Sequence, residues 1–308
     1  MTAASPAAAS RLTAGSGRPS LRHRLADRGV DRTLLLLVPG VLFLVLLFVY
    51  QFLYGLQLSF APQQGGGPLA NYQLFFSDSY LRDTIWTTLS IGLPAALVNV
   101  LISVPIAYRM RGRFRFKRTL TTLLVVPIAL GTVLTADGLL TLLGPAGWIN
   151  KTLVDFKLIG EPLMLVHNYW GVFFSLVITG FPFAFLLVLS YLSGIDPNLE
   201  RAASVMGAGW WARFRYVTFP LLVPGLAITF CLSFVLAFSV FPSANLVGDP
   251  SGATRVISIA AYHAAFEQFD YSMGSAISMI MGAVMLAIIA IVLGWRSTLF
   301  RGPTGGKG

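Results

Sequence analysis

Six long apolar stretches constrain the fold of this sequence more than any other feature. A bilayer has a hydrocarbon core about 30 Å thick, and crossing it takes about 20 helical residues because a backbone in lipid must satisfy its own hydrogen bonds. The stretches cover residues 33–60, 83–108, 119–143, 170–193, 217–241 and 273–295. The sequence therefore predicts an all-α polytopic membrane protein with six transmembrane helices.

The composition agrees with a membrane protein. Charged residues make up 11% of the chain and apolar residues 56%, whereas soluble domains carry roughly 25% charged residues. The net charge of +10 also suits nucleic-acid binding, but in a membrane chain excess arginine is first expected in cytoplasmic loops beside anionic headgroups. We therefore expect membrane lipids, and no nucleic acid, as partners. The single cysteine, Cys231, lies in an apolar run and excludes an intramolecular disulfide.

The distribution of lysine and arginine predicts the orientation. One side holds eighteen of them: six each in residues 1–32 and 109–118, and three each in 194–216 and 296–308. The other side holds four, namely Arg82, Lys151, Lys157 and Arg255. By the positive-inside rule, both termini are cytoplasmic. We expect a disordered cytoplasmic tail over 1–32, a six-helix domain over 33–295, and a second cytoplasmic tail over 296–308, in the inner (plasma) membrane.

Sequence signatures of catalysis are absent. The chain contains no GxxxxGK[ST], GxSxG or HExxH pattern, and its three histidines, His23, His167 and His263, are far apart in the sequence. These patterns mark nucleotide-binding, hydrolytic and zinc sites. We therefore expect that the chain is not an enzyme and binds no metal or cofactor itself.

The segment 194–220, between the fourth and fifth stretches, has the pattern of a short loop helix. Asp196 is a candidate N-cap with Pro197 at the first helical position, a favoured combination. Glu200 falls in the first turn, where its charge suits the helix dipole. The segment is therefore expected to be ordered.

The predicted loop helix has one apolar face. Leu199, Ala202, Ala203 and Met206 follow the spacing i, i+3, i+4 and i+7, and Gly207 then ends the helix together with Gly209. Such a helix can lie on a membrane, but small residues at the centre of the face favour close docking into a protein groove.

The loop resembles the signature of the permease subunits of binding-protein-dependent ATP-binding-cassette importers. That signature is x-Ala-Ala, three residues, Gly, nine residues, Ile-x-Leu-Pro. Here it reads Arg201-Ala202-Ala203, then Gly207, then Val217-Thr218-Phe219-Pro220, with both intervals intact. The family usually has glutamate where this chain has Arg201, so any contact made by that glutamate has been lost or has moved to Glu200.

The resemblance implies the type I importer architecture and a set of partners. Two permeases, identical or different, pair around a path, and each inserts its loop helix into one of two ATP-binding subunits. ATP and magnesium belong to those subunits, and an extracytoplasmic substrate-binding protein delivers the cargo. The resemblance thus assigns coupling to the ATPase to Glu200, Arg201, Ala202, Ala203, Met206, Gly207 and Pro220.

The cargo has two candidate classes. Gly147-Trp148-Ile149-Asn150, Phe181-Pro182-Phe183 and the start of the loop resemble polyamine-type permeases, which we favour. The segment 248–254, GDPSGAT, resembles sugar and glycerol-phosphate permeases. A secondary transporter is a third alternative, but it predicts charged residues in several spans and inverted repeats, and neither is evident.

Asp137 is the acidic residue well inside a predicted span, and an intramembrane carboxylate is a functional candidate because burying it is costly. One interpretation is that its carboxylate binds a cationic cargo. The other is that it lies near the end of its helix and is simply hydrated. Further candidates for the path are Thr135, Ser239 and Asn245, although such side chains also hydrogen-bond within or between helices.

Overall fold

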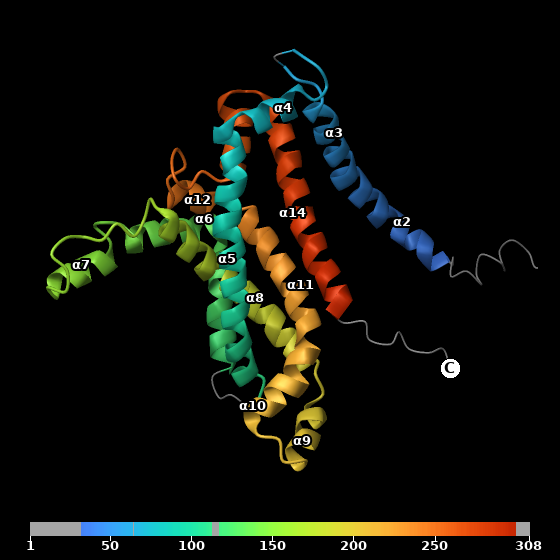
Figure 1. The fold of residues 1–308 in the computed structure, drawn as a ribbon, viewed down its shortest axis with the longest axis vertical. Coiled ribbons are helices and arrows are strands. Elements are labelled where there is room, and N and C mark those ends of the chain that lie inside the picture. The colour runs from blue at the N-terminus through green and yellow to red at the C-terminus, as the bar shows by residue number, and fades with distance from the viewer. Residues whose placement is uncertain (1–31, 64, 113–116, 300–308) are drawn as a thin grey trace, which may run out of the picture. The chain divides into compact units, whose positions relative to one another are not determined.

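The structure, a computed structural model, describes residues 32–63, 65–112 and 117–299, and all regular structure there is helical (Figure 1). Six helical segments among these residues are long and apolar enough to cross a membrane. They are Leu36–Ser59, Ser79–Met110, Arg118–Asp155, Tyr169–Ser193, Trp210–Phe238 and Tyr271–Arg296. The predicted fold class is confirmed. Residues 1–31 and 300–308 of the predicted tails lie outside the described residues.

The chain divides into two compact units, one up to Tyr54 and one from Gly55 onward. The first unit contains α2 (Arg32–Leu44), the π-helical turn η1 (Val45–Val49) and the first half of α3 (Tyr50–Ser59). Its side chains from Leu36 to Tyr54 are all exposed within the chain. A helix that is apolar all round suits contact with lipid or with other apolar helices.

The core of the second unit is formed by α5 (Ser79–Met110), α8 (Tyr169–Ser193) and α11 (Phe219–Phe238), which pack against one another. Gly92 on α5 permits a close approach, since a Cβ there would meet backbone atoms of Ala237 and Phe238 at 3.4 Å. Phe234 and Phe238 are completely buried in this core. A small residue at a helix contact is the usual device for close packing in membranes.

Five prolines lie inside the long helices of the second unit. They are Pro94, Pro105, Pro127, Pro182 and Pro224, whereas Pro39 lies in α2 and Pro220 lies at the start of α11. A further break was not predicted: α6 (Lys117–Leu143) has non-helical geometry at Gly131, with φ 74° and ψ 174°. Only glycine adopts this conformation without strain.

Short elements gather at the two ends of this bundle (Figure 1). One end carries α4 (Ala70–Ser77), and α7 (Trp148–Asp155), α12 (Pro242–Leu246), α13 (Ile257–Tyr262) and the π-turn η3 (His263–Glu267) also connect the long helices. The other end, here called the loop end, carries α9 (Pro197–Val205), α10 (Trp210–Arg213) and the π-turn η2 (Phe214–Thr218). The last helix is α14 (Tyr271–Leu299).

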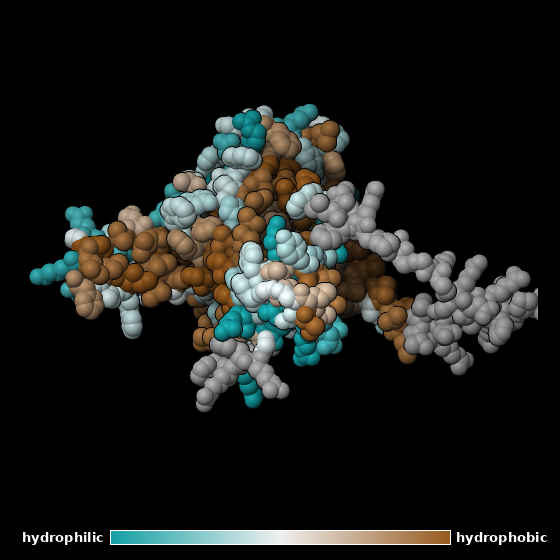
Figure 2. Space-filling model, turned by 60° about the horizontal axis from the view of Figure 1, so that its bottom comes forward, coloured by the Kyte–Doolittle hydropathy of each residue, from teal (hydrophilic) through white to brown (hydrophobic). Residues whose placement is uncertain are grey.

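Hydrophobic residues cover much of the surface visible in Figure 2. Over the whole surface of the described residues, Leu101, Leu123, Leu286 and Ile291 are examples of apolar side chains that are each at least 59% exposed. A soluble monomer rarely exposes contiguous apolar surface on this scale. The distribution matches a chain surrounded by lipid and by other subunits.

We predict that Gly92→Val destabilises the bundle by about 1–3 kcal/mol, as overpacking of a close contact does. Gly92→Ala should be nearly neutral, because its Cβ contact at 3.4 Å is tolerable. Thermal unfolding in detergent, followed by size-exclusion chromatography, measures the difference. Gly282→Val is the matched control, since nothing lies within 4 Å of a Cβ at Gly282 on α14; equal effects at both glycines would contradict the prediction.

Candidate coupling site

The N-terminus of α9 is capped as the sequence predicts. The backbone N–H of Asn198 donates to Asp196 Oδ1 at 2.9 Å, and Pro197 occupies the first helical position. The side chain thus satisfies one of the N–H groups that have no partner within the helix. The start of the loop helix is therefore fixed at Asp196.

The C-terminus of α9 depends on Gly207, which has φ +86°. The N–H of Ala208 donates to the carbonyl of Ala203, and the N–H of Gly207 donates to the carbonyl of Ser204, both at 3.0 Å. This pair of bonds is a Schellman motif, in which the glycine takes the left-handed conformation. Gly209, also predicted to end the helix, has the extended φ of −65° that any residue adopts.

The predicted apolar face of α9 is divided in the structure. Ala203 is buried at 6% exposure, whereas Leu199 is 47% exposed and Met206, just past the last helical residue, is 81% exposed. Ala202 is exposed too, as is Val205 at 89%, which the sequence analysis did not select. The helix therefore rests on the chain through Ala203 and presents four apolar residues outward.

Glu200 is held inside the chain. Its Oε1 lies 3.0 Å from Nη1 of Arg111, and the hydroxyl of Thr218 donates to the same oxygen. The Arg111 and Glu200 side chains are 13% and 17% exposed. Arg111 follows the end of α5 and Thr218 precedes α11, so one carboxylate connects α9 to two core helices. Charge-assisted bonds of this kind are stronger than neutral ones.

Aromatic side chains reinforce the same junction. The ring of Tyr108 on α5 lies 4.9 Å from that of Phe214 and 6.1 Å from that of Trp210, centroid to centroid. Trp211 and Phe219 extend the cluster, at 5.8 and 5.9 Å from Phe214. Such pairs add about 0.5–1.5 kcal/mol each beyond burial of their area. The segment between α9 and α11 is thus packed onto α5.

Arg201 lies on the outward side of α9. It is exposed, and its Nη1 donates to Asn198 Oδ1 at 3.1 Å within the same helix. Pro220 stands at the start of α11. The coupling residues predicted from the sequence therefore form one ordered unit, with Glu200 and Ala203 turned toward the chain and Arg201, Ala202 and Met206 turned away.

The four residues predicted to line the substrate path do not form one site, unlike the residues of the loop. Asp137, Ser239 and Asn245 are exposed, and Thr135 is half-buried with its hydroxyl bonded to the Gly131 carbonyl at 2.7 Å. Ser239 likewise donates to the carbonyl of Val235 at 2.8 Å. Since α12 packs against α6, Asn245 and Asp137 lie on neighbouring helices.

Two residues of functional interest were missed or misinterpreted in the sequence. Arg111 belongs to the basic segment 109–118, whose charges the sequence led us to expect beside anionic headgroups, and its guanidinium pairs with Glu200. Gly131 follows Pro127 by four residues, and this pairing was the available signal for a break in α6. No group of three or more metal-ligating side chains occurs among the described residues.

We predict that Arg111→Met loosens α9, because it leaves the Glu200 carboxylate without its cation. Loss of a hydrogen bond to a charged group costs about 1.5–3 kcal/mol, so the α9 amides should exchange with solvent roughly ten- to a hundredfold faster. Hydrogen exchange with mass spectrometry measures this. Glu200→Gln should act similarly and non-additively with Arg111→Met, whereas Arg201→Gln, the matched control, should exchange as wild type does. Unchanged protection in Arg111→Met would refute the anchor.

Comparison with known proteins assigns the family. Residues 99–301 match the family described as "binding-protein-dependent transport system inner membrane component". A probable sulfate transport system permease protein, cysT, from Prototheca wickerhamii is 30% identical over 67% of this chain and 78% of that protein. The trehalose/maltose permease MalF of Thermococcus litoralis is 26% identical over 89% and 95%, respectively. The spermidine/putrescine permease PotB of Haemophilus influenzae is 28% identical over 58% and 63%.

Comparison with solved structures also finds an ABC transporter. A chain in the crystal structure of a bacterial alginate ABC transporter, in complex with its alginate-bound periplasmic protein, superposes with a TM-score of 0.76 at 21% identity. The alignment covers 90% of this chain and 98% of that chain. The loop signature, the six candidate spans and the length of the matches all agree with this family. The chain belongs to the family of binding-protein-dependent transport system inner membrane components and is a multi-pass inner-membrane permease of an ABC importer.

Proposed function

We propose that α9 is the element through which this permease is driven by a separate ATP-hydrolysing subunit. The observation that supports this is a short helix, capped at both ends and anchored by Glu200, that still presents Leu199, Ala202, Val205 and Met206 outward. An amphipathic helix inserts its apolar face into a groove of its partner. ATP and magnesium reside on that partner, and the permease chain binds no cofactor.

The anchor suggests how movement is transmitted. Glu200 bonds to Arg111 after α5 and to Thr218 before α11, so displacement of α9 acts on two core helices together. Packed helices shift as rigid bodies between discrete arrangements. ATP-driven closure of the partner subunits thus rotates α5 and α11 and opens the path alternately to each side.

The proposed assembly follows from the charge distribution and the family. The loop end, with Arg109, Arg111, Arg201, Arg213 and Arg215, faces the cytoplasm under the positive-inside rule, as do both termini. The opposite end receives the substrate-binding protein. A second permease, identical or different, completes the path, and two ATP-binding subunits dock beneath the pair.

The proposed cargo is a small polar solute, with a polyamine-type cation favoured by the carboxylate of Asp137 in an apolar helix. A sugar is the second candidate. It is favoured by the similarity to the trehalose/maltose permease, which extends over 89% of this chain. Asp137 distinguishes the two, because a neutral sugar does not need a full negative charge.

We predict that Gly207→Val abolishes uptake while the partner subunits still hydrolyse ATP. A non-glycine residue in the left-handed region costs about 1–2 kcal/mol, which disrupts the Schellman motif and the shape of the docking surface. Proteoliposomes containing the whole importer give uptake and ATP hydrolysis together. Gly209→Val is the matched control, because Gly209 has an ordinary φ and open space around it. Equal effects of the two substitutions would count against the proposed coupling through α9.

We predict that Asp137→Asn lowers uptake of labelled spermidine at least tenfold while Asp137→Glu retains most of it. The reason is that a carboxylate on the path stabilises a passing cation and an amide does not. Asp155→Asn, an exposed acid on α7, is the control and should transport normally. The polyamine proposal would be wrong, and a sugar would be the cargo, if the wild type takes up no spermidine. Maltose uptake should then be the same in wild type and Asp137→Asn.

A further inference from the structure

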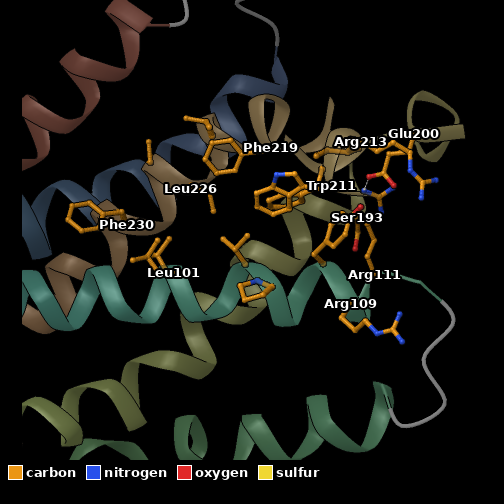
Figure 3. Close-up of a pocket in the computed structure, with 18 of the residues that line it drawn as sticks. Leu101, Arg109, Arg111, Ser193, Glu200, Trp211, Arg213, Phe219, Leu226 and Phe230 are labelled. Carbon is orange, nitrogen blue, oxygen red and sulfur yellow. Dashed lines mark hydrogen bonds and ion pairs between the residues drawn. The ribbon is translucent and has the colours of Figure 1, made fainter. Parts of the chain in front are cut away.

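A large groove lies between the loop-end halves of α5 and α11, the end of α14 and the loop segment 193–214. Its volume is about 1330 Å³, larger than the roughly 300–1,000 Å³ of sites for drug-sized ligands. Figure 3 shows the groove in close-up. Coupling through α9 uses only the Arg111–Glu200 pair at its margin and does not account for the groove.

The groove has an apolar half and a basic end. The apolar lining comprises Leu97, Leu101, Val223, Leu226, Ala227, Phe230 and Val292. The other end is lined by Arg109, Arg111, Arg201 and Arg213, with Glu200 as the acidic residue among its lining, and Arg296 lines the groove from α14. In Figure 3, Leu101, Leu226 and Phe230 lie toward one end, and Arg213, Arg111 and Glu200 lie at the other.

The basic end carries uncompensated positive charge. Glu200 neutralises Arg111, and the other ion pair in the described part of the chain is His263–Glu267. Arg109 and Arg213 at this end therefore have no acidic partner among the described residues. The Nε of Arg213 is also fully buried without a hydrogen-bond partner there. A buried donor left unpaired is costly, so this end is suited to receive an anion.

We propose that the groove binds an anionic phospholipid from the leaflet next to the loop end. Arg109 and Arg213 attract the phosphate, and the acyl chains lie along Leu101, Leu226 and Phe230. Basic pockets between membrane helices bind anionic headgroups in this way. Trp210 and Trp211 line the groove beside the charges, as tryptophans do at headgroup depth.

Other occupants fit the groove less well. A small polar cargo gains nothing from walls of leucine, valine and phenylalanine, because its polar groups would lose their hydration without replacement. A second copy of the chain, with 22 basic and 12 acidic residues, would bring another arginine-rich loop end beside this one. Like charges disfavour that contact. The lipid satisfies both halves of the groove at once.

Quenching of tryptophan fluorescence by brominated lipids tests the proposal in vesicles containing the full-length chain. The difference between wild type and Trp211→Phe isolates the signal of Trp211, one of the tryptophans that line the groove. We expect brominated phosphatidylglycerol to quench that signal at an at least fivefold lower mole fraction than brominated phosphatidylcholine does. Arg213→Gln combined with Arg109→Gln should remove the preference, whereas Arg82→Gln, at the other end of α5, should retain it.

Three results of the quenching assay would overturn the proposal. They are equal quenching by the two lipids, a preference retained in the double variant, and no quenching by either lipid, which means that protein fills the groove. Displacement by soluble glycerol phosphate would also overturn it, because the acyl chains are part of the ligand. If the double variant fails to fold, the wild-type preference must still weaken as salt is raised, since exposed charge interactions are screened.

Discussion

A peptide group that crosses lipid finds no water, so its hydrogen bond must come from its own helix or from a neighbour. The consequences extend to the polar side chains of the core. Thr88, Ser103 and Thr229 are buried, and each hydroxyl donates to the carbonyl four residues earlier, at 2.6, 2.6 and 2.9 Å. Bonds within a helix leave few polar groups for a neighbour to satisfy, and Thr88 is one residue that does both, since its hydroxyl oxygen also accepts from the Ile257 N–H at 2.8 Å.

Among the described residues, both ion pairs lie at or beyond the ends of the long helices. The Arg111–Glu200 pair lies at the loop end, where the side chains are 13% and 17% exposed and so retain some hydration. A fully buried pair would cost more in desolvation than it returns. At the edge of the bundle the pair orients α9 at a moderate cost, because the bonds from Arg111 and Thr218 to Glu200 Oε1 fix how α9 meets α5 and α11.

Much of the fold could be predicted from the sequence because hydropathy and spacing determine it locally. The six spans, the cap at Asp196 and the glycine after α9 all follow from residues near each other in the chain. The inward contacts could not be predicted, because Arg111 and Glu200 are 89 positions apart and only folding brings them together. The break at Gly131 was missed for another reason: hydropathy averages over a window, and one glycine does not change the average.

The departure at Arg201 can now be explained by helix geometry. Successive side chains on an α-helix point about 100° apart because the helix has 3.6 residues per turn. Glu200 faces Arg111 and Thr218, whereas Arg201 faces outward and bonds only within α9 among the contacts described. An acid moved back by one residue therefore serves the interior of the permease and cannot take over an outward contact. If the ATPase partner of this chain recognises position 201, it must do so with an acidic group of its own, opposite in charge to the partner of a glutamate.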